Sequence, residues 1–205
     1  MTIPDGQTAS ADTWTAADAD PERGWATLSQ DAKRERILCA AGRVFAADGL
    51  DAPMPAVAAA AGAGVASVYR QFPSKTDLLA AVVTQRLEQI RDAAIAATTR
   101  DVDRWTALTE MLLTLVQQQS ADKFLDDALR RVRAHPDVAD ASRRWLEVIG
   151  LLVAQAQAEG TVRPDATATD IRLLFAATGA AQTIEPGAWQ RMLTLLLDGL
   201  RTPAP

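Results

Sequence analysis

A cluster of hydrogen-bonding side chains between residues 65 and 75 is the part of the chain best suited to specific chemistry. It holds Ser67, Tyr69, Arg70 and Gln71, and Lys75 follows shortly after. Arginine can donate two hydrogen bonds to the edge of guanine, and glutamine can pair with the edge of adenine. Hydroxyl and ammonium groups suit the phosphates of the same duplex. These residue types indicate recognition of DNA rather than catalysis.

Two short helices are predicted to position this cluster. Apolar residues recur with helical spacing over residues 54–61, and Gly62 ends that helix with a tight turn. A second helix is expected over residues 65–71, held from behind by Val68 and Phe72. Two short helices joined by a glycine-containing turn form a helix-turn-helix, whose second helix enters the major groove.

Longer helices are expected on both sides of this pair. The upstream helix is predicted over residues 31–47, where apolar residues form one stripe. Downstream, Ser74 begins a helix that extends to about residue 98, and Ser74-x-x-Asp77 resembles a capping box. Lys75 then lies in the first turn of this helix, where free backbone N–H groups favour an anion such as a phosphate.

The remainder of the chain is also predicted to be helical, because apolar residues recur at steps of three and four and alternating strand patterns are scarce. The fold class is therefore all-α, with a small N-terminal helix-turn-helix domain and a larger C-terminal helical domain. We expect an acidic disordered tail over residues 1–28, the first domain over 29–75 and the second over 76–205. The further helices are expected over residues 105–119, 122–134, 137–159, 167–183 and 187–201.

The stretch VAAAAGAGVASVYRQFPSK, residues 57–75, resembles the signature of the TetR family of transcriptional regulators. Tyr69-x-x-Phe72, followed by Ser74-Lys75 and a Leu-Leu pair, is the distinctive part. The similarity extends from Arg34 to Val83. Two positions differ from the family pattern: Pro53 stands where Ser or Thr commonly caps the first helix of the pair, and Ala63 stands where a larger apolar residue is usual.

The resemblance implies a double-stranded DNA partner and a set of contact residues. Gln71 would read adenine, Tyr69 would contact a phosphate, and Lys75 would clamp one. Two alternatives stay open: Tyr69 could be a half-buried aromatic with a solvated hydroxyl, and the basic start of the first helix, with Arg34, could be an ordinary solvated turn. The expected DNA-binding residues are Arg34, Val65, Ala66, Ser67, Tyr69, Arg70, Gln71 and Lys75.

The C-terminal domain is expected to serve ligand sensing and dimerisation. Proteins of this type pair through their last two helices, and a homodimer would bind a palindromic operator, with two recognition helices about 34–36 Å apart. The expected interface residues are Thr178, Gly179, Gln182, Trp189, Met192, Leu193 and Leu196. A pocket for an unknown, mainly apolar effector is expected among the middle helices, with walls from Trp105, Leu108, Met111, Leu112, Phe124, Trp145, Ile149, Leu152 and Phe175, although ordinary core is the alternative for each of them.

Composition limits the remaining possibilities. The chain has a formal net charge of −5, but residues 29–80 carry six basic side chains against five acidic ones, so a local positive face is possible. One cysteine and one histidine predict no metal site, no disulfide and no cofactor. His135 is expected in a loop and Cys39 in the core. No apolar run is long enough for a membrane span and no secretion signal is visible, which predicts a cytoplasmic protein.

The sequence thus predicts a homodimeric transcriptional repressor that a small molecule releases from its operator. The alternative is a helical small-molecule-binding protein or enzyme without DNA binding, which the acidic composition favours. Against an enzyme stands the lack of any nucleophile–base spacing, metal motif or phosphate loop.

Overall fold

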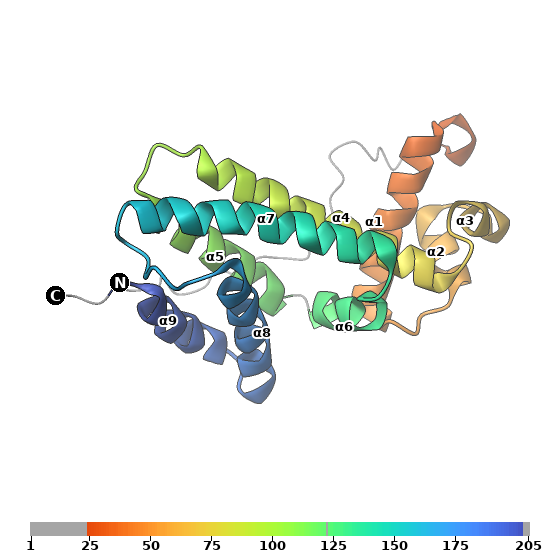
Figure 1. Ribbon diagram of the computed structural model, residues 1–205. Helices are drawn as coiled ribbons and strands as arrows, with labels where there is room; N and C mark the ends of the chain where they lie inside the picture. The colour runs from red at the N-terminus through yellow and green to blue at the C-terminus, as the bar shows by residue number, and fades with distance from the viewer. Residues whose placement is uncertain (1–23, 122, 203–205) are drawn as a thin grey trace. The chain divides into compact units, whose positions relative to one another are not determined.

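The computed structural model describes residues 24–121 and 123–202, and this part of the chain is almost entirely helical (Figure 1). It also contains a short 3₁₀ turn at Trp25–Thr27 and an isolated β-bridge between Val162 and Arg201. The all-α prediction is confirmed, while the predicted tail falls mostly on residues 1–23, outside the described part. The α-helices are α1 (Gln30–Asp48), α2 (Met54–Ala61), α3 (Val65–Gln71), α4 (Lys75–Thr98), α5 (Arg104–Ala121), α6 (Lys123–Val132), α7 (Pro136–Ala158), α8 (Ala168–Ile184) and α9 (Ala188–Leu200).

The contacts divide the chain into two compact units. Within the described residues, the helix-turn-helix unit holds residues 24–85 and 123–139, and the C-terminal unit holds residues 86–121 and 140–202. The helix-turn-helix unit therefore takes in the first half of α4 and all of α6. The domain boundaries expected from the sequence, near residues 28 and 75, stay a prediction.

In the helix-turn-helix unit, α1, α2 and α3 enclose a small apolar core. Phe45, Val57, Val68, Phe72 and Leu78 are almost completely buried in it. The Ser29 side chain caps α1 by accepting a hydrogen bond from the Ala32 N–H at 3.1 Å. Because helices as short as α2 and α3 are marginal alone, this shared core is what stabilises them.

The turn between α2 and α3 depends on a left-handed residue. Gly62 has φ 63° and ψ 31°, and its N–H donates to the last carbonyls of α2, at Ala58 and Ala59. A side chain in this conformation is strained, which explains glycine here. Pro53 takes the N-cap position of α2 without a side-chain cap, as the sequence predicts.

Helix α6 is attached to the helix-turn-helix unit at its two ends. The Phe124 ring stacks on Phe45 of α1, with centroids 6.0 Å apart and planes inclined by 18°. At the other end, Arg131 Nη1 lies 2.7 Å from a carboxylate oxygen of Asp51, in the connection between α1 and α2. These two contacts hold α6 against residues that are about 80 positions away in the chain.

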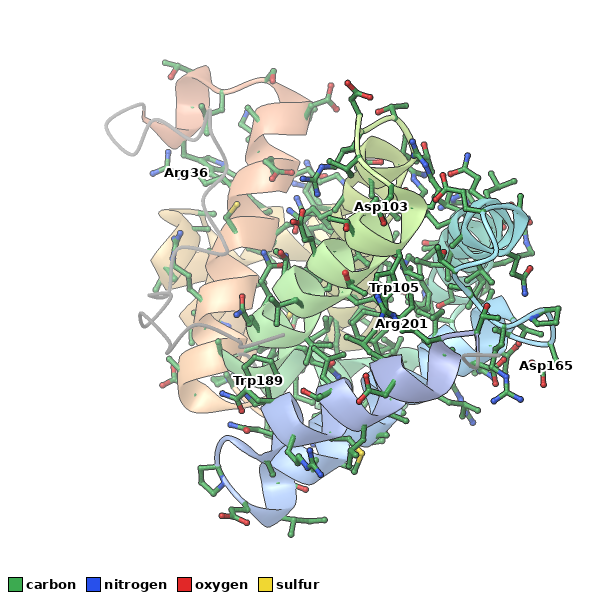
Figure 2. All side chains as sticks on the ribbon, turned by 90° about the vertical axis from the view of Figure 1, so that its left-hand side faces the viewer. Arg36, Asp103, Trp105, Asp165, Trp189 and Arg201 are labelled. Carbon is green, nitrogen blue, oxygen red and sulfur yellow. The ribbon has the colours of Figure 1, made fainter. Side chains whose placement is uncertain are left out.

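The C-terminal unit is built around one apolar cluster. Leu108, Leu112, Ile149, Leu152 and Ile171 are completely buried in it. Helices α8 and α9 lie side by side (Figure 1), and Thr167 and Asp170 form a capping box at the start of α8. The Arg201 guanidinium, just after α9, lies over the Trp105 ring of α5 at 4.8 Å from its centroid (Figure 2).

Substitution of Gly62 by alanine tests the role of this turn. An added Cβ at Gly62 meets Arg36 Nη2 only at 3.6 Å, an ordinary contact, so the cost comes from the backbone conformation. We expect Gly62→Ala to lower the free energy of unfolding by about 1 kcal/mol in urea titrations followed by circular dichroism. Gly150→Ala, inside α7, has room for a Cβ and should instead raise it by roughly 0.5–1 kcal/mol. Equal effects at both positions would contradict this explanation.

Candidate nucleic-acid interface

Helix α3 presents one face to solvent and buries the other. Val68 and Phe72 are 0% and 2% exposed, whereas Val65 and Tyr69 are 39% and 46% exposed. Ala66 and Arg70 are exposed as well. This alternation is what a helix needs when it packs on its own unit with one side and enters a groove with the other.

The polar side chains of α3 are held in defined positions. Arg70 Nη2 donates a hydrogen bond to Ser67 Oγ at 2.8 Å, one turn earlier. Gln71 is partly buried, and its Nε2 donates to Gln30 Oε1 at the start of α1, also at 2.8 Å. The Gln30 partner was not predicted from the sequence, because 41 positions separate the two glutamines.

Arg34 of α1 lies next to this face. Its guanidinium carbon is 4.5 Å from the centroid of the Phe72 ring, and the arginine is exposed on the other side. A cation held over an aromatic face keeps its charge and most of its donors available. The guanidinium of Arg34 therefore lies beside α3, and its contact with DNA stays a prediction.

Lys75 is directed toward the end of α1. Its ammonium lies 5.9 Å from the centroid of the Phe45 ring, and the residue is partly buried. The hydrogen bond and the charge of Arg131 are the main causes that lower the pKa of the Asp51 carboxyl, and the charge of Lys75 is a smaller cause. A lysine that clamps a phosphate from this position must swing its flexible stem away from Phe45.

The start of α4 is a capping box made by Ser74 and Asp77, as predicted. The Ser74 Oγ accepts from the Asp77 N–H at 3.1 Å, and Asp77 Oδ2 accepts from the Ser74 N–H at 2.9 Å. The Ser74 hydroxyl also donates to Asp77 Oδ2 at 2.7 Å. These bonds lower the pKa of Asp77, with the Ser74 side chain as the largest cause and His135 as a smaller one.

His135 connects the end of α6 to this cap. It lies in the connection between α6 and α7, as expected, and its Nε2 is 3.5 Å from Asp77 Oδ1. The contact was not predicted from the sequence, since a single histidine before a proline carries no signal for a partner 58 positions away. Cys39 is buried in α1, as expected for a core residue.

Comparisons with known proteins place both parts of the chain. Residues 37–82 match the family model of bacterial regulatory proteins of the tetR family, and residues 103–202 match the C-terminal domain of SbtR-like transcriptional regulators. A TetR transcription regulatory protein from Mycobacterium vanbaalenii is 32% identical, with 83% of this chain and 95% of that chain covered and a TM-score of 0.61. The chain belongs to the TetR family of transcriptional regulators. It is a DNA-binding transcriptional regulator and not an enzyme.

A second solved structure supports the same assignment. The TetR transcriptional regulator SCO0520 from Streptomyces coelicolor is 30% identical, covers 83% of this chain and 99% of its own, and has a TM-score of 0.63. No curated protein sequence matches the chain. In the described residues of this TetR-family protein, no helix has the length and apolar character of a membrane span.

The predicted pocket residues of this regulator are brought together with one exception. Trp105, Trp145 and Phe175 meet in or against the core of the C-terminal unit, together with the predicted leucines, Met111 and Ile149. Phe124 belongs elsewhere: it is part of the helix-turn-helix unit, where it stacks on Phe45. The physical reason is that the apolar stripe of α6 packs on α1, which the spacing of α6 alone cannot reveal.

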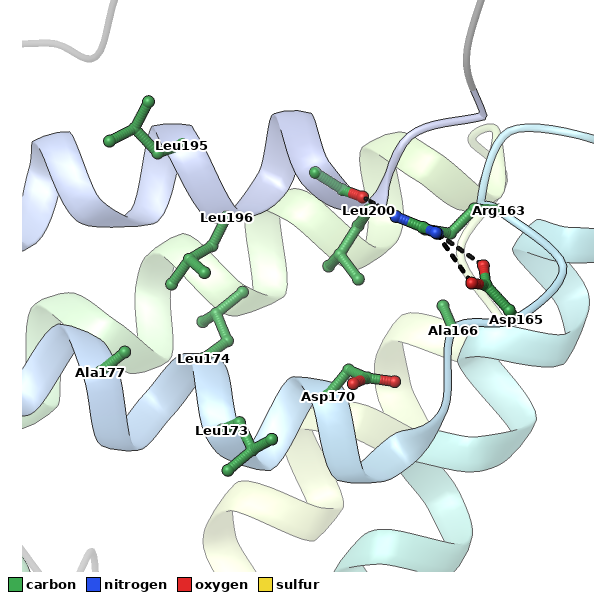
Figure 3. A pocket seen from close by; sticks show the side chains of 11 residues that line it. Arg163, Asp165, Ala166, Asp170, Leu173, Leu174, Ala177, Leu195, Leu196 and Leu200 are labelled. Atoms are coloured by element: carbon green, nitrogen blue, oxygen red, sulfur yellow. Dashed lines mark hydrogen bonds and ion pairs between the residues drawn. The ribbon is translucent and has the colours of Figure 1, made fainter.

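The predicted interface residues of α8 and α9 divide between two environments. Thr178, Trp189 and Leu193 are at most 8% exposed and are covered by their own chain. Gln182 accepts a hydrogen bond from the Gly187 N–H at 2.9 Å and so shapes the turn between the helices. Gly179, Met192 and Leu196 are only partly buried. A groove of about 510 Å³ runs along α8 and α9 (Figure 3). Its apolar lining includes Leu173, Leu174, Ala177, Leu195 and Leu196, and its charged lining consists of Arg163, Asp165 and Asp170.

The cap at Ser74 gives a prediction with a pH dependence. Ser74→Ala removes the hydroxyl that accepts from Asp77, and we expect a loss of about 1 kcal/mol in the free energy of unfolding at pH 7. Because the pKa of Asp77 is lowered in the folded state, its contribution is present above the usual carboxyl pKa and is lost as the pH falls through the lowered value. The difference between wild type and variant should therefore shrink in urea titrations toward pH 3. A difference that stays constant with pH would exclude the ionised Asp77 as its cause.

Proposed function

We propose that this TetR-family protein acts in the cytoplasm as a homodimer that holds a palindromic operator through two copies of α3 and releases it when a small, mainly apolar molecule binds the C-terminal unit. The observation that carries the DNA-binding part is the exposed face of α3. Tyr69 and Arg70 lie on this face, with Arg34 beside it and a buried anchor behind it. Slim or hydrogen-bonding side chains on a firmly packed short helix suit insertion into the major groove.

Names of similar structures support the small-molecule part. One structure of this fold is a gamma-butyrolactone receptor described as ArpA-like, at 20% identity and a TM-score of 0.60. Another is SmeT, the repressor of the Stenotrophomonas maltophilia multidrug efflux pump SmeDEF, at 21% identity and a TM-score of 0.62. Identities this low establish the fold alone for this chain, and the gamma-butyrolactone receptor is an example of a protein with this fold that is named for a small-molecule ligand.

Helix α6 offers a covalent route from ligand to DNA. It follows α5 and precedes α7 in the chain, and most of α7 belongs to the C-terminal unit, whereas Phe124 and Arg131 of α6 contact the helix-turn-helix unit. A ligand that displaces the end of α5 or the start of α7 would also displace α6, which lies between them in the chain. Because Phe124 of α6 stacks on Phe45, this displacement would reach α1. Release requires that the ligand bind the non-DNA geometry more tightly, because equal affinity for both states shifts no population.

The groove between α8 and α9 supports the homodimer. Leu173 and Leu195 on its walls are 56% and 49% exposed, and Figure 3 shows them on neighbouring helices. Exposed apolar side chains that line one groove are typical of surfaces that a partner covers. The interface we propose is therefore centred on this groove, with Leu196 from the predicted set, rather than on the buried Trp189 and Leu193.

DNA binding is tested with genomic fragments that the protein retains. We expect Lys75→Ala to weaken binding to all fragments and to reduce the slope of log K against log salt by about one unit, since it removes one phosphate contact. Gln71→Ala should instead relax the preference at one base position in each half-site. Fluorescence anisotropy at two or more salt concentrations measures both effects.

A matched control for these variants is Arg143→Ala, which removes an exposed cation on α7 that pairs with Glu147. It should leave DNA affinity and salt slope unchanged. If Lys75→Ala and Gln71→Ala behave like this control, the assignment of α3 and the α4 start to DNA is wrong. A wild-type protein without salt-sensitive binding to any fragment would favour the small-molecule-binding alternative.

Dimerisation is tested by a charge in the groove. We expect Leu195→Glu to convert the dimer to monomer in sedimentation velocity, because a carboxylate would have to be buried without a partner at the interface. Leu151→Glu on α7 is the control, since this leucine is 61% exposed and lies outside the groove. The monomeric variant should also lose most of its operator affinity. A dimer that persists in Leu195→Glu would contradict the proposed surface.

A further inference from the structure

The indole N–H of Trp145 is a buried hydrogen-bond donor. Trp145 lies on α7 in the core of the C-terminal unit, and 7% of its surface is exposed. Its Nε1 is inaccessible to solvent and finds no acceptor in the described part of the chain. Buried polar groups in folded proteins are nearly always paired, and a buried tryptophan usually finds a partner for this group. A group that departs from this rule requires an explanation.

The surroundings of this donor come from three helices. The Phe175 ring of α8 meets the Trp145 ring edge-on, with centroids 5.7 Å apart and planes inclined by 65°. The backbone carbonyl of Phe175 accepts a hydrogen bond from Gln119 Nε2 of α5 at 3.3 Å. On α7, Ile149 and Leu152 are fully buried in the same cluster. A molecule that reaches Trp145 therefore meets apolar and aromatic groups, the unpaired indole donor, and the Gln119 amide, whose Nε2 already donates to Phe175.

We propose that Trp145 is the polar anchor of the effector site, and that the effector is an apolar or aromatic molecule with a carbonyl oxygen that accepts from Trp145 Nε1. This inference rests on the proposed function only in placing the effector in the C-terminal unit. A single neutral donor suits the oxygen of a ketone, ester or amide, because a carboxylate at this position would be buried against one uncharged partner. The carbonyl oxygen of the effector accepts the hydrogen bond from Trp145 Nε1, and its carbon skeleton packs against apolar side chains without breaking a polar contact.

Two probes of the same shape separate the hydrogen bond from apolar burial. Acetophenone and isopropenylbenzene share one carbon skeleton, and the second carries a methylene group where the first carries the carbonyl oxygen. The chain has five tryptophans, so a protein labelled with ¹⁵N at the indoles gives few signals to assign. We expect acetophenone to move the Trp145 indole proton downfield, and isopropenylbenzene to bind without this shift.

The affinity difference has a predicted size. One net hydrogen bond corresponds to a preference for acetophenone of about 2- to 10-fold over isopropenylbenzene. Trp145→Phe should abolish the preference. Trp189→Phe makes the same chemical change in the same core, where Trp189 is 8% exposed, and should keep it. If Trp145→Phe fails to fold, the titration of the wild-type protein with the two probes still tests the proposal. The Trp145 indole signal can then be assigned through its short proton–proton distances to the Phe175 ring.

Each outcome bears on the proposal. Equal affinity for both probes, a Trp145 signal that neither probe moves, or no binding of either probe overturns it. A Trp145 proton that is already downfield and unchanged by acetophenone indicates a resident water and also overturns it. Operator release is measured separately by anisotropy: probe binding at Trp145 without release would count against the proposed regulation and leave the site intact.

Discussion

The exposed face of α3, with Val65, Tyr69 and Arg70, depends on one constraint: Val68 and Phe72 pack against the core of the helix-turn-helix unit. Helix α3 has seven residues, too few to be stable alone, so its tertiary contacts fix both its existence and its rotation. With those two side chains buried, the helical period turns Val65, Tyr69 and Arg70 outward. Gly62 forms the left-handed turn between α2 and α3, and the Arg34 guanidinium lies over the Phe72 ring. The residues that α3 presents to DNA are therefore determined by the packing of Val68 and Phe72 in the core.

Features set by neighbouring residues could be predicted from the sequence. The bounds of α2 and α3 coincide with the predicted ranges, because apolar spacing and nearby glycines determine them within a few positions. The Ser74 and Asp77 cap was also predictable, since its two partners are three residues apart. The longer helices α4 to α9 were found with ends shifted by one or two residues.

Features set by distant partners could not be predicted. The sequence of an amphipathic helix shows that the helix has an apolar stripe, but it does not show which other helix covers that stripe. For that reason Phe124 was assigned to the ligand pocket, although α6 packs on α1. Trp189 and Leu193 are predicted at the dimer interface from the apolar stripe of α9, and the structure shows that the core of the C-terminal unit covers both side chains. The ion pair of Arg131 with Asp51 likewise joins residues 80 positions apart, and it cannot be predicted from the residue types or their spacing.

The acidic composition of the chain is compatible with a surface that binds phosphates. Charges interact strongly only within about 8 Å at physiological salt, so the net charge of −5 matters less than the groups close to α3. Three acidic side chains of the helix-turn-helix unit have partners within it: Asp51 pairs with Arg131, Asp77 caps α4, and Glu35 accepts from Gln85 at 2.7 Å. Arg70 is exposed on the outer face of α3, and the exposed Arg34 lies beside this helix. Arg131 compensates the charge of Asp51, whereas a hydrogen bond from a neutral group leaves the charges of Asp77 and Glu35 in place. The exposed Arg34 and Arg70 still place positive charge at α3, and a docking polyanion responds to this local charge more than to the net charge of the chain.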